Sequence, residues 1–219
     1  MSPRFRRPAL AAGVALVSLA AACGGAPAAT SPSSTPARAP APSTSTTAVP
    51  SVAVEVGPGS RAVYPVEPQK APGTCRYSWV GSDPLPDPAC TPGAVNPDVT
   101  QADIDTTICR PGWTATVRPP ERVTEPEKVG SAAAYGYTGS FATAEYDHLV
   151  PLELGGDPND PANLWVEPND DPDATSTHNA KDDLEDLLRS LVCAGGLPLA
   201  VAQRAIASNW VAAASRYGS

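Results

Sequence analysis

The stretch that decides the fold reads EYDHLVPLELGGDPNDPANLWV and covers residues 145–166. Apolar residues gather toward its two ends, and prolines, glycines and aspartates fill its middle. This pattern predicts a short strand over residues 141–150, a turn over residues 151–156 and a second short strand over residues 163–166. The segment is therefore expected to form a hairpin with a long polar loop.

Two helices are expected after this hairpin. Ser176 or Thr177 can cap the first, and the glycines at 195 and 196 end it. Its leucines recur at helical spacing: Leu184, Leu187, Leu188 and Leu191. Pro198 can open the second helix, whose apolar stripe would pack against the first: Leu199, Ala202, Ile206, Trp210 and Ala213. Residues 131–219 thus predict an α+β fold, a hairpin plus helix with a following C-terminal helix.

The preceding part, residues 61–130, is rich in cysteine and proline. Its prolines are spaced so closely that no helix longer than about three turns is expected, except around residues 99–108. This part of the folded domain should consist of turns and short strands.

The N-terminus has the pattern of an export signal. Arg4, Arg6 and Arg7 precede a short apolar run over residues 8–22. The sequence LAAAC that ends at Cys23 resembles a bacterial lipobox, which predicts a signal peptide over residues 1–22 and lipidation of Cys23. We expect a cell-membrane lipoprotein that faces the extracytoplasmic side, or a secreted protein if Cys23 is not lipidated. Residues 23–60, mostly Ala, Pro, Ser and Thr, predict a disordered tether.

Four cysteines remain if Cys23 carries lipid. An even number in an exported chain indicates two disulfides, for which three connectivities exist. We expect Cys75 to pair with Cys90 across a short loop, and Cys109 to pair with Cys193 and join the two halves. A zinc site is the competing interpretation, and the absence of a Cys-x-x-Cys pair disfavours it.

The charge of the chain limits its functions. It carries 15 basic and 23 acidic residues, a formal net charge of −8. Cleavage of the signal peptide would leave 12 basic residues against 23 acidic ones, a net charge of −11. So acidic a chain disfavours phosphate binding without a metal ion.

The chain contains two histidines, and each lies near an aspartate. Asp147 directly precedes His148, and Asp182 follows His178 by about one helical turn. Together with Pro151, the glycines at 155 and 156, Asn163 and Lys181, this pattern resembles the HNH, or ββα-metal (His-Me finger), endonucleases and exported actinobacterial proteins described as HNH-like.

The resemblance implies a role for each matching residue in a ββα-metal finger. His148 would be the general base and Asn163 would orient its imidazole. Asp147 and His178 would hold one divalent cation (Mg, Mn, Ni or Zn), with Asp182 as a third ligand or supporting partner and Asn179 as the substitute for His178. Lys181 would contact the substrate phosphate or be solvated.

The expected function is a metal-dependent endonuclease that hydrolyses phosphodiester bonds of DNA, or RNA, with little sequence specificity at the bacterial cell envelope. Its expected partners are a nucleic acid substrate and a membrane reached through the lipid on Cys23, with no nucleotide cofactor and a monomeric chain. The alternative is a catalytically inert, HNH-derived envelope lipoprotein that binds a protein or a metal. In that case His148 is a buried histidine with Asp147 as its hydrogen-bond partner. Glu145 and Glu153 are expected to face solvent, although Glu145 could lie near the cleft.

Overall fold

The computed structural model describes residues 54–171 and 173–218, which belong to one compact unit, Thr47–Ser219. The expected signal peptide, Cys23 and the tether as far as residue 53 lie outside the described residues. No helix of the described part is both long and apolar enough to cross a bilayer.

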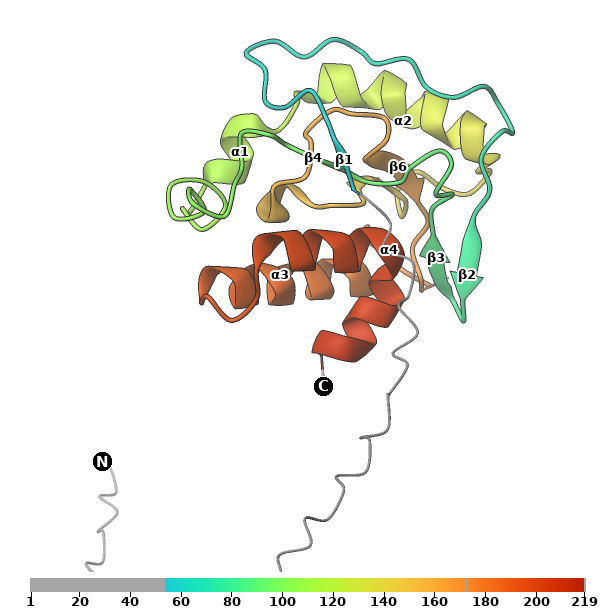
Figure 1. Cartoon of the computed structure of the whole chain (residues 1–219). Coiled ribbons are helices and arrows are strands. Elements are labelled where there is room, and N and C mark those ends of the chain that lie inside the picture. The colour runs from blue at the N-terminus through green and yellow to red at the C-terminus, as the bar shows by residue number, and fades with distance from the viewer. Residues whose placement is uncertain (1–53, 172, 219) are drawn as a thin grey trace, which may run out of the picture. The chain divides into compact units, whose positions relative to one another are not determined.

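The described unit is a mixed α+β fold, as predicted, with short strands in two-stranded sheets and four α-helices (Figure 1). The strands are β1 (Glu55–Val56), β2 (Ser78–Val80), β3 (Asp83–Leu85), β4 (Ala94–Val95), β5 (Glu145–His148) and β6 (Leu164–Glu167). The helices are α1 (Trp113–Val117), α2 (Glu121–Tyr135), α3 (Ala180–Cys193) and α4 (Leu199–Tyr217), with a 3₁₀ turn η1 (Leu152–Leu154).

The predicted hairpin is present as β5 and β6, which pair antiparallel from Glu145 opposite Glu167 to His148 opposite Leu164. The first strand is shorter than the predicted 141–150. Ser140 begins a turn there, with its hydroxyl oxygen accepting from Ala142 N at 3.1 Å and its carbonyl oxygen accepting from Thr143 N at 3.4 Å. These local bonds compete with strand pairing.

The two predicted C-terminal helices also form, and they pack together on one side of the unit (Figure 1). Their contact surface supplies much of the main core: Leu184, Leu188, Val192, Leu199, Ala202, Ile206 and Trp210. Helix α4 begins after Pro198, as predicted. Helix α3 begins later than expected, because Asn179 rather than Ser176 or Thr177 is its N-cap, in a capping box with Asp182.

Helix α2 is longer than the sequence predicted, and it crosses the expected boundary at residue 130. Pro126 lies inside it and removes one backbone donor. Packing offsets this loss: Ser131 Oγ accepts from Val166 N of β6 at 3.0 Å, and Ala132 packs with Val166. Tertiary contact thus overrides a poor local helix signal.

Residues 99–108 form turns instead of the expected helix. The Asp103 side chain accepts from both Thr100 N and Thr100 Oγ1 at 2.8 Å, and Thr107 Oγ1 donates to Asp103 O at 2.9 Å. These side-chain bonds hold the backbone in successive turns.

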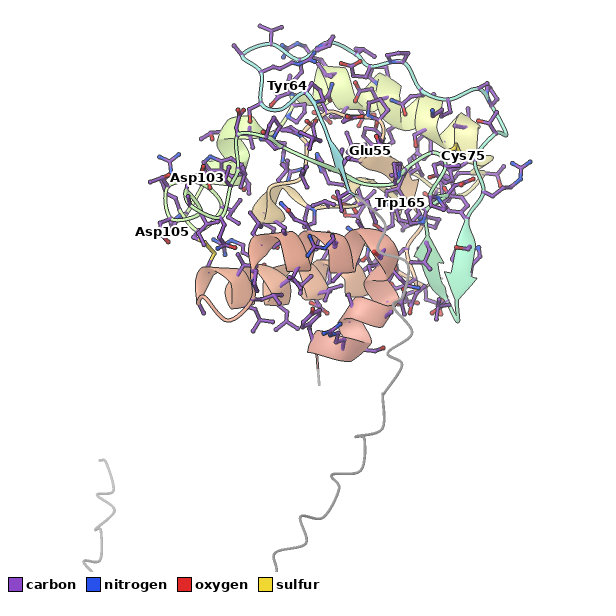
Figure 2. All side chains as sticks on the ribbon, in the orientation of Figure 1. Glu55, Tyr64, Cys75, Asp103, Asp105 and Trp165 are labelled. Atoms are coloured by element: carbon purple, nitrogen blue, oxygen red, sulfur yellow. A yellow bond between two sulfur atoms is a disulfide. The ribbon has the colours of Figure 1, made fainter. Side chains whose placement is uncertain are left out.

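Both predicted disulfides are confirmed, Cys75–Cys90 and Cys109–Cys193. The first packs in a small cluster with Tyr135 and the fully buried Trp165. Cys75 and Trp165 are labelled near each other in Figure 2. The second ties the turn region to the end of α3. Two disulfides indicate an oxidising, extracytoplasmic compartment.

Removing Cys109–Cys193 by double substitution to serine should destabilise the chain more than removing Cys75–Cys90. The sequence separations are 84 and 15 residues, and loop-closure entropy predicts losses of about 4–5 and about 3 kcal/mol. Chemical denaturation of the two double variants measures both losses. An equal loss, or a larger one for Cys75–Cys90, would contradict this expectation.

Candidate active site

The loop between β5 and β6 is built around Asn163. This fully buried side chain accepts from Val150 N at 2.9 Å and Ala94 N at 3.2 Å, and donates to the carbonyl oxygens of Val150 and Asp157, both at 3.0 Å. Gly156 is required beside it, because a Cβ there would lie 1.7 Å from Val150 O. Asn163 therefore shapes the loop. The resemblance implied that its side chain or its backbone orients the His148 ring; the side chain makes no hydrogen bond to that ring, so an effect on the ring would come through the loop.

The same loop holds His148. The imidazole is buried, and its Nε2 lies 3.0 Å from Pro158 O. A carbonyl oxygen only accepts, so the proton is assigned to Nε2 and Nδ1 is left with its lone pair. Burial lowers the pKa of His148 to about 4. The ring is therefore neutral near pH 7, with a free lone pair on Nδ1.

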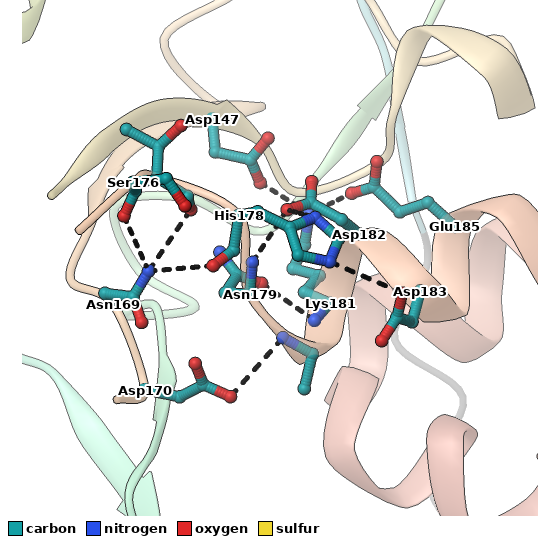
Figure 3. A network of polar contacts seen from close by, with 12 residues as sticks. Asp147, Asn169, Asp170, Ser176, His178, Asn179, Lys181, Asp182, Asp183 and Glu185 are labelled. Atoms are coloured by element: carbon teal, nitrogen blue, oxygen red, sulfur yellow. Dashed lines mark hydrogen bonds and ion pairs between the residues drawn. The ribbon is translucent and has the colours of Figure 1, made fainter. Parts of the chain in front are cut away.

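Lys181 joins strand β5 to helix α3 from inside the protein (Figure 3). It is only 1% exposed, and its Nζ donates to Asp147 Oδ2 at 2.5 Å, to His148 O at 3.0 Å and to Glu185 Oε1. Lys181 is thus neither a solvated lysine nor free to contact a phosphate, in contrast to both sequence-based expectations. Its aliphatic stem is buried, and its ammonium group is paired within a buried network.

One ammonium in this network faces three buried carboxyl groups. Burial alone would raise the pKa of Asp147, but the Lys181 ammonium holds it below its usual value. Burial raises the pKa of Glu167 and of Glu185 well above the usual range, against the opposing effect of Lys181. Neither oxygen of Glu167, which is 1% exposed, has a hydrogen-bond partner among the described residues. A protonated Glu167 beside the Asp147 carboxylate fits this arrangement.

The other expected metal ligands lie at the N-terminal end of α3, where His178 is exposed and the N-cap Asn179 is buried. His178 has a side chain that is 66% exposed, with Nδ1 3.2 Å from Asp182 Oδ2 and Nε2 3.5 Å from Asp183 Oδ1 (Figure 3). Asp182 also accepts from Asn179 N at 2.9 Å, and Asn179 Oδ1 accepts from Lys181 N at 2.7 Å. The structure thus brings His178 and Asp182 together. Asp147 instead pairs with Lys181, and the Asn179 side chain caps helix α3.

Within the described ranges, no three His, Cys, Asp or Glu side chains are already gathered around one point as a metal site. Two adjoining hollows nevertheless bring most of the expected residues to one surface. The first is lined by His148, Arg118 and five carboxylates: Glu145, Asp147, Glu153, Asp182 and Glu185. The second shares four of these carboxylates and adds Thr177, His178 and Asp186. We call the two hollows together the acidic pocket.

Glu145 and Glu153 are the residues that sequence reasoning undervalued. Both line the acidic pocket and are partly buried, whereas their alternation with apolar neighbours had favoured solvent for both, with a place near the cleft as the alternative for Glu145. Burial, reinforced by Asp147 and Asp182, raises the pKa of Glu145 to about 7. Burial also raises the pKa of Glu153, whose Oε1 has no partner among the described residues. The one local signal was that Glu145 lies two residues before Asp147 and so shares its strand face.

Comparison of the chain with family models, with curated proteins and with solved structures gave no match. The chemistry of the acidic pocket is therefore inferred from its own geometry.

Replacing Lys181 with methionine should lower the free energy of unfolding by about 3–5 kcal/mol, because the buried carboxylate of Asp147 would lose its counter-charge. Denaturant unfolding at pH 7 measures the loss. The matched control is Lys70→Met on the exposed surface, where a change within about 0.5 kcal/mol is expected. A loss at Lys181 as small as that of the control would show that the network does not stabilise the fold.

Replacing Glu167 with glutamine should stabilise the chain increasingly as pH rises. The folded-state pKa of Glu167 is raised, so folding keeps a proton that the unfolded chain releases above about pH 4.5. Wild-type stability is therefore lost as pH rises from that value toward the folded-state pKa, by up to about 1.4 kcal/mol per pH unit. Glutamine mimics the neutral acid and removes this loss.

Thermal unfolding of wild type and Glu167→Gln from about pH 5 to about pH 8 tests this. The stability difference should be small at the acid end and grow toward the alkaline end, whereas exposed Glu55→Gln should show no such trend. A difference that does not change with pH would be evidence against a protonated Glu167.

Proposed function

We propose that this chain is a metal-dependent endonuclease that hydrolyses phosphodiester bonds of DNA, or RNA, with little sequence specificity on the extracytoplasmic side of the envelope. The observation that supports it most is His148, a neutral buried imidazole fixed through Nε2 and lining a pocket rich in carboxylates. A base oriented in this way and open on one side suits removal of a proton from a water molecule.

The orientation of His148 comes from the loop that Asn163 builds. Pro158 O, which holds Nε2, lies one residue beyond Asp157, whose carbonyl accepts from Asn163 Nδ2. Asn163 would thus be a positioning residue that acts on the imidazole through the loop. Nδ1 is the nitrogen left to take the proton of the attacking water.

The acidic pocket offers ligands of the kind that a divalent cation requires. Glu145 makes no ion pair among those between described residues, and Glu153 presents a buried oxygen without a partner. These two carboxylates, with Asp182 and His178 at the edge, would hold one cation. Oxygen ligands favour Mg or Mn, and the imidazole would allow Ni or Zn. When bound, the cation would offset the charge on the phosphate and on the leaving oxygen.

The proposed location joins the oxidised cysteines with the N-terminal pattern. The disulfides support an extracytoplasmic domain, and lipidation at Cys23 would keep it at the membrane surface. Low sequence preference is proposed because the pocket is acidic, and a base-reading surface usually carries basic side chains.

A second candidate function is a catalytically inert, HNH-derived module that binds a protein or a metal. One observation favours it: Lys181 neutralises Asp147, the residue that the family pattern assigns to the cation. In that case the network of Lys181 would have replaced a metal as the link between β5 and α3.

Cleavage of plasmid DNA by the oxidised chain, freed of its signal peptide, separates the two candidates. Degradation should need Mg, Mn, Ni or Zn and stop with a chelator, and His148→Ala should lower its rate by about 10²–10⁴-fold because the base is lost. The control is Lys70→Ala, at an exposed position outside the acidic pocket. It should keep the wild-type rate.

Two outcomes would count against the nuclease. Cleavage at the wild-type rate by His148→Ala would point to a different site, and no cleavage with any of the four metals would favour the inert module.

A further inference from the structure

Arg118 is the one arginine or lysine among the residues that line the acidic pocket. Its side chain is exposed, and none of the ion pairs between described residues involves it, although carboxylates line the same pocket. An unpaired guanidinium beside acidic groups is available to a ligand rather than committed to the fold.

The backbone at Arg118 is held in place by contacts on both sides of this residue. It directly follows α1, which is anchored in the core by Trp113 and Val117. The carbonyl oxygen of Val117 accepts from the buried Tyr64 hydroxyl at 2.7 Å, and Arg118 N donates to Thr114 O at 3.1 Å. The prolines at 119 and 120 then restrict the chain on the other side. The guanidinium therefore projects from a fixed point on the pocket wall.

We propose that Arg118 is the anion-binding residue of the acidic pocket, where it binds the non-bridging oxygens of a phosphodiester. This inference rests on the proposed function and specifies its substrate as a charged phosphodiester. A planar guanidinium presents parallel N–H donors that match two oxygens of a phosphate group. The pocket then has two poles, carboxylates that would bind a cation and one guanidinium that binds the anion, with His148 in the same lining.

The alternative role for Arg118 is to neutralise the neighbouring carboxylates without contacting substrate. The two roles predict different effects of Arg118→Gln. Loss of a neutralising charge would change cation binding alone. Loss of an anion ligand would weaken binding of the phosphodiester and leave binding of an uncharged analogue unchanged.

The test is calorimetric binding of the thymidine dinucleotide TpT and of its neutral methylphosphonate-linked analogue, in Mg²⁺, to the full chain carrying His148→Ala so that no cleavage intervenes. Adding Arg118→Gln should weaken TpT binding by about 10- to 100-fold, the loss of a charge-assisted hydrogen bond. Binding of the neutral analogue should not change, and Mg²⁺ affinity should stay the same or rise. Arg118→Lys keeps the positive charge but loses the parallel N–H donors of the guanidinium. Its affinity for TpT should lie between those of the chains with arginine and with glutamine at this position.

The control is Arg122→Gln on the exposed face of α2, which should leave TpT binding unchanged. Equal TpT binding with and without Arg118→Gln, or no TpT binding to the chain with Arg118 intact, would overturn the proposal. Plasmid cleavage by the wild-type chain separates the proposed nuclease activity from the proposed anion site at Arg118. Arg118-dependent TpT binding without any cleavage would leave the anion site standing and remove the nuclease.

Discussion

The structure depends on one buried ammonium group. Lys181 Nζ donates to Asp147, to Glu185 and to the backbone carbonyl of His148, so a single atom fixes the end of β5 against the first turns of α3. If this contact broke inside the protein, water could not solvate the charged groups left behind. Breaking it is therefore costly, which keeps the geometry rigid. The position of His148 relative to the carboxylates of α3 follows from this link.

The second constraint is the loop between the strands of the hairpin. Asn163 uses its amide on four backbone groups, and Gly156 allows the chain to pass where a side chain would collide with Val150 O. The loop in turn presents Pro158 O to the imidazole. The sequence of contacts from amide to loop to ring explains how an irregular, proline-rich segment can hold an imidazole in one orientation and one tautomer.

The charge distribution around this imidazole is uneven. Carboxylates crowd the pocket, burial raises the pKa values of Glu145 and Glu153, and one unpaired guanidinium lies on the same wall. A group of like charges in a partly enclosed site is stabilised by a cation. Under the proposed function, a cation and a phosphate would meet in this pocket beside the neutral imidazole. The two disulfides indicate that the domain lies outside the cytoplasm.

The sequence by itself determined the hairpin, the two C-terminal helices, the number of disulfides and the placement of His148 beside a polar loop. These features depend on local periodicity, on turn residues and on counting cysteines. Only the tertiary structure decided which of the three disulfide connectivities forms, that Lys181 is buried against Asp147, that the Asn163 side chain binds the loop backbone, and that Glu145, Glu153 and Arg118 share one pocket. The physical reason is that burial and charge pairing depend on which segments fold over one another. Lys181 of α3 and Asp147 of β5 are 34 residues apart in the chain, and no local pattern records their contact.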